Sequence, residues 1–167
     1  MGARGLRRPA SRHLTTARQR ADALGPPDAD GVEGPFACTV SRAGGFWADT
    51  HFALHEPQPT LQLANQAIAA FEATPPAQRN VGSERMVRCE QVKAHLALGE
   101  FDGAAEVFQP VLETAVEHRV GPLLRRVADI ASTAQHTSTH TNELRAIFEG
   151  ATDFIQLPAP DAPRSLS

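Results

Sequence analysis

The sequence predicts an all-α fold of six or seven helices of short to medium length. Three observations support this. Apolar residues recur at i, i+3, i+4 and i+7 in successive segments, which is the helical period. Turns containing Gly and Pro separate these segments at regular distances. No stretch alternates apolar and polar residues between hairpin turns, as a half-buried strand would. With 167 residues, 41% of them hydrophobic, the chain is long enough for one domain with a core.

The N-terminal part of the chain differs from the rest in composition. Residues 12–24 favour a helix, and residues 25–35 contain three prolines and three glycines, which predicts a linker or exposed loop. The first twenty residues hold six arginines and no acid, which is typical of a solvated terminus. We therefore expect residues 1–35 to be a basic helix plus a partly disordered linker. A helical-repeat domain is expected over residues 36–157 and a disordered tail over residues 158–167.

The first two helices of the repeat domain are expected at residues 41–55 and 59–73. Pro59 suits the start of the second one because its missing N–H costs nothing in a first turn. That segment carries an apolar stripe of Leu61, Ala64, Ala67, Ile68 and Phe71. After the break at residues 74–83, Ser83 is the expected cap of a third helix, which ends at Gly99.

Three more helices follow. The fourth begins near Phe101 and has the strongest stripe in the chain, with Pro110 expected to bend it. The fifth is entered at Gly121–Pro122 and is expected to break at the polar run of residues 132–142. The last one spans approximately Leu144 to Ile155. Each of the three is amphipathic, so we expect each to bury one face against its neighbours.

Two of the predicted hairpins repeat each other at an offset of 44 residues. The alignment places residues 55–68 on residues 99–112, so that His55 falls on Gly99. Both copies then have a small-residue contact and an aliphatic pair at the same steps: Ala64 on Phe108, Ala67 on Val111 and Ile68 on Leu112. A repeat of this length is typical of stacked helical hairpins.

The second copy resembles a tetratricopeptide (TPR) repeat. The family pattern has glycine at the turn, an aromatic residue two positions later, alanine three further on and an aromatic four after that. The matching residues are Gly99, Phe101, Ala104 and Phe108. The first copy departs from the pattern, with His55, Pro57, Thr60 and Ala64 at those positions. The resemblance implies antiparallel hairpins stacked as a right-handed solenoid, with these residues in the repeat packing. The usual TPR period is about 34 residues, so the longer offset predicts longer helices or a longer join.

A narrower resemblance covers about three quarters of the chain. The stretches GPFACTVSRAGGFWADTHFAL, AQRNVGSERM, HLALGEFDGAAE and PVLETAVEHRVGPLLRR are together similar to the C-terminal helical-repeat half of actinomycete transcriptional regulators of the XRE type. In that group a helix-turn-helix precedes the repeats. The first fifty residues here offer one basic helix and a Gly/Pro-rich loop instead. The resemblance implies a regulatory, transcriptional role without a recognisable DNA-reading domain.

Composition argues against several functional classes. A net charge of −3 does not favour nucleic-acid binding, and a DNA-binding role of the arginine-rich start would require a steep dependence on salt. No segment approaches 18 consecutive apolar residues, so no membrane span is expected. Cys38 and Cys89 lie far apart without a CxxC motif, which favours two reduced thiols. We expect a cytoplasmic protein.

Motifs for catalysis or metal binding are not evident. His51 and His55 form H-x-x-x-H, but Phe52 stands where a zinc hydrolase would place glutamate. No G-x-S-x-G, P-loop or G-x-G-x-x-G sequence occurs. Cys89 is interpreted as a core residue and Arg125–Arg126 as rim charges. We expect no enzyme activity, no cofactor and no metal.

A binding groove is the remaining hypothesis. In TPR arrays the first helix of each hairpin lines the concave face, and one subfamily clamps a peptide carboxylate with lysine and asparagine. The corresponding positions here are Gly45, Asp49, Cys89 and Lys93, of which Lys93 alone could serve, so that clamp is absent. The expected groove contains Arg42, Asp49, Phe52, Met86, Lys93 and Leu96. It would suit an extended or helical peptide with apolar anchors and an acid. Alternatively, these residues face solvent or a neighbouring helix.

The leading functional hypothesis is therefore a non-catalytic TPR-like module that binds a protein or peptide in a regulatory system. The alternative is a structural element that self-associates, for example as a homodimer, and has no ligand. Hairpin arrays expose apolar terminal faces unless those faces are capped, which is what makes the alternative reasonable.

Overall fold

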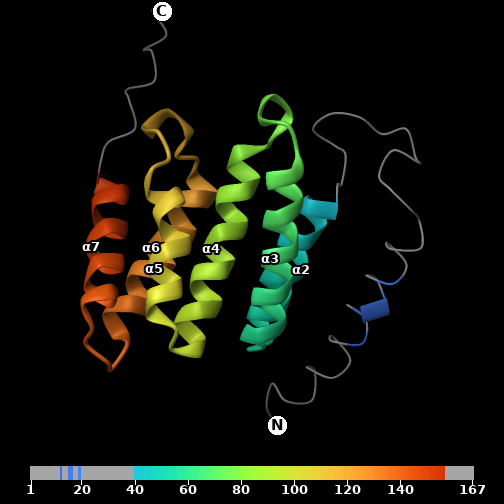
Figure 1. Ribbon diagram of the computed structural model, residues 1–167. Coiled ribbons are helices and arrows are strands. Elements are labelled where there is room, and N and C mark those ends of the chain that lie inside the picture. Colours follow the sequence, from blue (N-terminus) through green and yellow to red (C-terminus); the bar gives the residue numbers. More distant parts are fainter. Residues whose placement is uncertain (1–11, 13–14, 17–18, 20–39, 157–167) are drawn as a thin grey trace, which may run out of the picture.

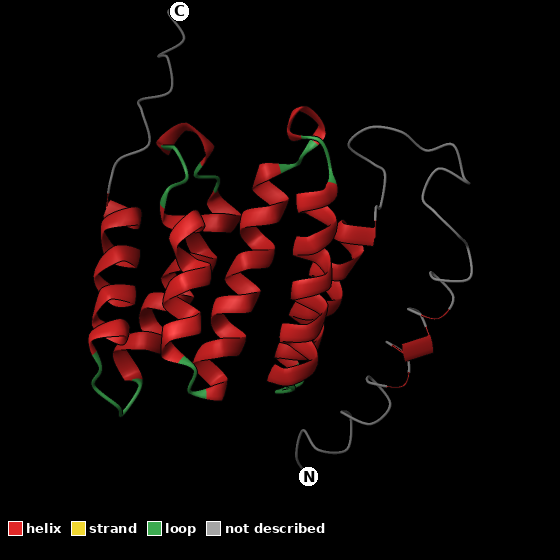
Figure 2. Ribbon diagram, in the orientation of Figure 1, coloured by secondary structure: helices red, strands yellow, loops and turns green. Residues whose placement is uncertain are grey.

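The computed structural model describes residues 12, 15, 16, 19 and 40–156. Within residues 40–156 the structure is all-α, with six helices packed as adjacent antiparallel pairs and no strand (Figure 2). The predicted fold class is thus confirmed at this level. The expected segments at residues 1–35 and 158–167 lie outside the described residues, apart from helical positions at 12, 15, 16 and 19.

The six helices form three consecutive hairpins. Their bounds are α2 Val40–Ala53, α3 Pro57–Ala73, α4 Val81–Leu98, α5 Phe101–Leu112, α6 Gly121–His136 and α7 Asn142–Gln156. Two short 3-10 turns, η3 Pro76–Gln78 and η4 Val116–His118, lie in the linkers between hairpins. In Figure 1 the turns within the hairpins lie at the lower end of the array, and both linkers lie at the upper end.

Neighbouring hairpins contact each other through both their first and their second helices. Helix α2 contacts α4, and α4 contacts α6, in addition to the pairings α2 with α3, α4 with α5 and α6 with α7. On the other side α5 contacts α7, whereas α3 packs against α4. Helices α2, α4 and α6 therefore form one row, and this row carries the site described below.

The first two hairpin turns have the same geometry. His55 and Gly99, which the sequence alignment superimposes, have φ values of 58° and 77°. In each turn a histidine binds the glutamate five residues later. The Nδ1–Oε2 distance is 2.6 Å between His51 and Glu56 and 2.8 Å between His95 and Glu100. Each glutamate N–H also donates to the carbonyl of its histidine at 3.0 Å. The 44-residue repeat thus extends to the side chains that close the turns.

The two linkers repeat each other at an offset of 40 residues. Arg79 donates to the carbonyl of Thr74 at 3.2 Å, and Arg119 donates to that of Thr114 at 2.9 Å. Arg119 also donates to the carbonyl of Phe154 at 2.9 Å and stacks on its ring, which ties the second linker to α7. The offset falls from 44 to 40 because α5 has 12 residues where α3 has 17, so the second hairpin is about one helical turn shorter.

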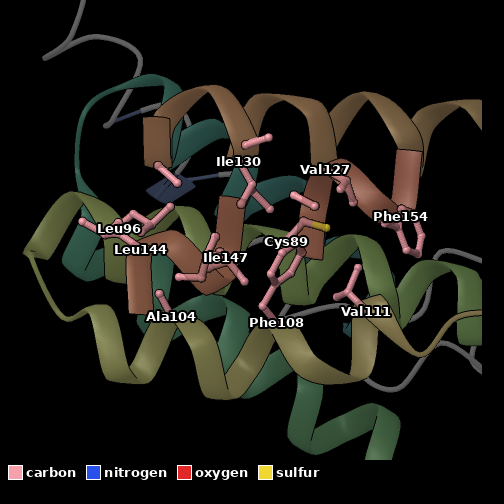
Figure 3. Close-up of a cluster of buried hydrophobic side chains, with 14 of the residues drawn as sticks. Cys89, Leu96, Ala104, Phe108, Val111, Val127, Ile130, Leu144, Ile147 and Phe154 are labelled. Atoms are coloured by element: carbon pink, nitrogen blue, oxygen red, sulfur yellow. The ribbon is translucent and has the colours of Figure 1, made fainter. Parts of the chain in front are cut away.

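The larger of two apolar clusters lies between α4, α5, α6 and α7 (Figure 3). Figure 3 labels its members Cys89, Leu96, Ala104, Phe108, Val111, Val127, Ile130, Leu144, Ile147 and Phe154. A smaller cluster joins α2 and α3 to Val87 of α4. The predicted packing residues Ala64, Ala67, Ile68, Ala104 and Phe108 are all buried, and Phe101 is half-buried against the larger cluster. Small residues allow close approach: a Cβ on Gly44 would lie 3.0 Å from Cβ of Ala67.

Two helix starts differ from the prediction. The cap of α4 is Asn80, whose Oδ1 accepts the N–H of Ser83 at 2.9 Å, so the expected cap at Ser83 is wrong. Helix α3 begins at Pro57 rather than Pro59, with both prolines in its first turn, where neither loses a helical hydrogen bond.

The helix α6 ends inside the run where a break was predicted. The run 132–142 does break the helix, but α6 continues into it as far as His136, and α7 begins at Asn142. Ala134 is buried there at 6% exposure, which anchors the last turn to the core. The hydroxyls of Thr133 and Thr137 donate to carbonyls four residues earlier, at 2.8 Å each, so these polar side chains are satisfied by the helix itself.

Candidate functional site

A hollow of about 110 Å³ opens on the row formed by α2, α4 and α6. We call it the groove pocket; its lining residues are Gly45, Phe46, Ser83, Met86, Val87, Glu90 and Arg126. Phe46 is 61% exposed, the largest exposed fraction of any bulky apolar side chain described. The pocket therefore combines an apolar wall from α2 and α4 with charged groups from α4 and α6.

Four charged residues from all three helices meet beside this pocket. We call Asp49, Glu90, Lys93 and Arg126 the charged cluster. Nζ of Lys93 lies 2.6 Å from Oε2 of Glu90, and Nη1 of Arg126 donates to Oε1 of the same carboxylate. Asp49 is bound less closely: its Oδ1 accepts from Nη1 of Arg126 at 3.3 Å and lies 3.7 Å from Nζ of Lys93. With two acidic and two basic side chains, the formal charges of the cluster sum to zero.

Burial and charge act against each other in this cluster. Burial raises the pKa of Glu90, and the neighbouring Lys93 and Arg126 oppose that rise. For Arg126, burial acts to lower the pKa, but the carboxylates of Glu90 and Asp49 outweigh it and raise the pKa, so the guanidinium remains charged. The cluster thus places a charged guanidinium, that of Arg126, at the wall of the pocket.

An aromatic ring completes the surroundings of Lys93. Its Nζ lies 4.7 Å from the centroid of the Phe52 ring, a distance at which a cation is attracted by the ring face. The side chain of Lys93 is only 11% exposed. Lys93 is therefore held by α2 through Phe52 and Asp49 and by its own helix through Glu90.

The predicted groove residues divide into three groups. Asp49, Phe52 and Lys93 come together in the charged cluster and its surroundings, and Met86 lines the groove pocket. Leu96 is 7% exposed and lies in the larger apolar cluster instead, because its position on α4 faces α5 and α6. Arg42 belongs to α2, but its side chain is outside those the structure describes.

Six residues of the site were not among the predicted groove residues: Gly45, Phe46, Ser83, Val87, Glu90 and Arg126. Arg126 was interpreted as a rim charge; its side chain is 25% exposed, and it also binds Glu90 on another helix. The spacing of Glu90 and Lys93 on one helix is a weak local signal for an ion pair. No local signal links Arg126 to Glu90, which lies 36 residues earlier.

The other candidate chemical groups of the described residues lie in turns or in the core. Among the described residues, no group of three or more His, Cys, Asp or Glu side chains is placed to hold a metal ion. His51 is engaged by Glu56, and His55 is exposed at the turn. Cys89 is fully buried, and burial with the nearby Glu90 raises the pKa of its thiol to about 12. Nor does any helix described here have the length and apolar character needed to cross a membrane.

The fold and the site together define an all-α protein of antiparallel helical hairpins with a partly charged pocket on the row of first helices. Comparison with protein-family models, with curated proteins and with solved structures finds no match to the chain.

Proposed function

We propose that this chain is a non-catalytic, TPR-like module that binds a protein or peptide partner in a transcriptional regulatory system. In this proposal the three hairpins stack as a right-handed solenoid, and the row of α2, α4 and α6 is its ligand-binding face. The single observation that carries the proposal is the groove pocket, because it places an exposed aromatic side chain, Phe46, beside a hollow on that face.

The dimensions and lining of the pocket favour a peptide segment as the ligand. The pocket has a volume of about 110 Å³, which leaves room for about one side chain of a partner. Phe46 and Met86 supply apolar area that a partner side chain would remove from water, which stabilises a complex at roughly 25 cal/mol per Å² of apolar surface. Polar groups at the pocket edge would fix the register of the bound segment.

The regulatory part of the proposal rests on the sequence resemblance. The stretches that resemble the repeat half of XRE-type regulators include AQRNVGSERM, which forms the second half of the linker before α4 and its first turns. This stretch contains Ser83 and Met86, both of which line the groove pocket. The residues that carry the resemblance and those that form the candidate site therefore overlap.

A selection with a random peptide library displayed on phage tests the proposal. The full chain is compared with Ser83→Phe, which places a ring in the pocket, and with Ser132→Phe, which places one on an exposed position of α6. We expect the wild type and Ser132→Phe to enrich the same sequence motif and Ser83→Phe to lose it. If no motif is enriched and sedimentation equilibrium shows a dimer, the proposal is wrong and the alternative of a self-associating structural element is favoured.

A further inference from the structure

The two acids of the charged cluster differ in how deeply they are buried and how closely they are bound. The Glu90 side chain is 1% exposed and uses both oxygens, one for Arg126 and one for Lys93. Asp49 is 47% exposed, and its Oδ1 lies 3.3 Å from Arg126 and 3.7 Å from Lys93. Glu90 is thus a fixed part of the interior, whereas Asp49 is a half-exposed acid at longer distances.

The charge balance depends on the loosely held member. Two cations and the buried carboxylate of Glu90 leave one positive charge, and Asp49 neutralises it from the solvent side. An ion pair with one half-exposed partner contributes little, because water competes for both groups. Rotation of the Asp49 side chain into solvent therefore costs the protein little and leaves a cationic site formed by Arg126 and Lys93.

This cationic site adjoins the apolar pocket. Arg126 and Glu90 line the groove pocket themselves, together with the apolar side chains of Phe46, Met86 and Val87. Arg126 connects the pocket to Asp49, because it lines the pocket and also binds Oδ1 of Asp49 at 3.3 Å. Charge complementarity at that position selects a carboxylate.

We propose that Asp49 occupies, in the free protein, the position that an acidic side chain of the partner takes in the complex. The ligand is a peptide segment in which an apolar residue, inserted beside Phe46, adjoins an aspartate or glutamate whose carboxylate replaces Asp49 on Arg126 and Lys93. This inference rests on the proposed peptide-binding function and adds the chemistry of the ligand. It also gives Asp49 a role as an internal competitor that weakens binding.

The test uses the peptide motif enriched on the full wild-type chain, synthesised with a fluorescent label. The labelled peptide and its version with amide in place of the acid are titrated by fluorescence polarisation. We expect the acidic peptide to bind at least about tenfold more tightly, with an affinity that falls as salt rises. Asp49→Asn should tighten binding of the acidic peptide about two- to fivefold, which corresponds to removing one weak competing pair.

Matched variants separate this effect from general changes in charge. Asp129→Asn, at an exposed position of α6, removes one negative charge away from the cluster and is the control for Asp49→Asn. Arg125→Gln, at the exposed neighbouring position, is the control for Arg126→Gln. Arg126→Gln should abolish the preference for acid, and Arg125→Gln should keep it. Should Arg126→Gln not fold, Asp49→Asn still decides, because Asp49 is half-exposed. Thermal melting checks that each variant is folded.

The outcomes distinguish the two proposals. Failure to enrich any peptide overturns the binding function itself. Enrichment of a motif without acid, or equal affinities for the acidic and amide peptides, leaves the binding function in place and overturns the role of Asp49. The role of Asp49 is also overturned if Asp49→Asn leaves the affinity for the acidic peptide unchanged or weakens it. Asp49 would then not compete with the ligand.

Discussion

His55 and Gly99 lie 44 residues apart in the chain and both adopt left-handed backbone conformation, with φ of 58° and 77°. They lie in the turns that follow α2 and α4 and reverse the chain into α3 and α5. Glycine adopts this conformation readily, whereas a residue with a Cβ is disfavoured in it. The same turn is therefore built twice, once with the favoured residue and once without it.

Because one turn has histidine and the other glycine in the left-handed position, we predict that exchanging the residue type changes stability in opposite directions at the two turns. His55→Gly should raise the free energy of unfolding by about 0.5–1 kcal/mol, because relief of the left-handed strain exceeds the added flexibility of the unfolded chain. Gly99→Ala should lower it by about 1 kcal/mol, since no atom lies within 4 Å of the new Cβ and the cost is purely conformational. Urea denaturation measures both, and effects of the same sign would contradict the prediction.

Close contact of α2 with α4 predicts a cost for a methyl group at Gly45. A Cβ there would lie 2.8 Å from Cγ2 of Val87, a buried β-branched side chain with little freedom to move. Gly45→Ala should lower the free energy of unfolding by about 1–2 kcal/mol, despite the better helix propensity of alanine.

Gly82→Ala is the control for this substitution. Gly82 is also helical, but its nearest neighbour would be Oδ1 of Asn80 at 3.6 Å, an ordinary contact distance. This variant should be more stable by about 0.5 kcal/mol. Equal effects of the two substitutions in thermal or urea unfolding would show that α2 does not pack on α4 as described.

The pair of Glu90 and Arg126 predicts strong coupling in a double-mutant cycle. Arg126→Met should lower the free energy of unfolding by about 2–3 kcal/mol, because the buried carboxylate of Glu90 loses one of its two cations. The double variant with Glu90→Leu should recover to within about 1 kcal/mol of the wild type, because no buried acid then remains unpaired. Arg125→Met, on an exposed neighbour, should change stability by less than about 0.5 kcal/mol. Additive effects of the two cluster substitutions would contradict the observed contact.

Burial of Cys89 predicts a loss of stability at alkaline pH. Burial raises the pKa of its thiol from 9.0 to about 12, so between these values the unfolded chain ionises the thiol while the folded chain keeps the proton. The contribution is complete below pH 9.0 and falls by up to about 1.4 kcal/mol per pH unit as the pH rises above that value. The free energy of unfolding of the wild type should therefore fall more steeply with pH than that of Cys89→Ala.

Thiol labelling provides an independent readout of the same burial. In a Cys38→Ser background, iodoacetamide should modify Cys89 only as fast as the protein unfolds. Parallel stability profiles of wild type and Cys89→Ala, or rapid labelling of the native protein, would show that the thiol is accessible.

Much of the fold could be predicted from the sequence because the relevant signals are local. The stripe around Phe101 and Phe108 has the helical period, and the glycine at position 99 marks the turn. Errors occurred where two local signals compete. Asn80 and Ser83 are both good caps three residues apart, and the helix begins at the earlier one. The polar run after Ala131 ends α6 only at His136, since Ala134 within the run is buried in the larger apolar cluster.

The candidate site could be predicted only in part. Asp49, Phe52 and Lys93 were assigned to one groove because the TPR resemblance implies that the first helix of each hairpin lines the concave face, and they lie on α2 and α4. Glu90 and Arg126 were missed because a charged residue on an amphipathic helix has the same local pattern whether it faces water or another helix. Their contact depends on how closely α4 and α6 approach and in which register.

The sequence by itself determined the helices, their turns and the repetition of the first two hairpins, because helical period and turn residues act over a few positions. The tertiary structure alone decided that Asp49, Glu90, Lys93 and Arg126 form one cluster beside the groove pocket. That outcome depends on the packing of α2, α4 and α6, which small residues such as Gly45 allow, and on the shortening of the second hairpin by about one helical turn. Charges far apart in the chain meet only when packing distance and register bring their helices together.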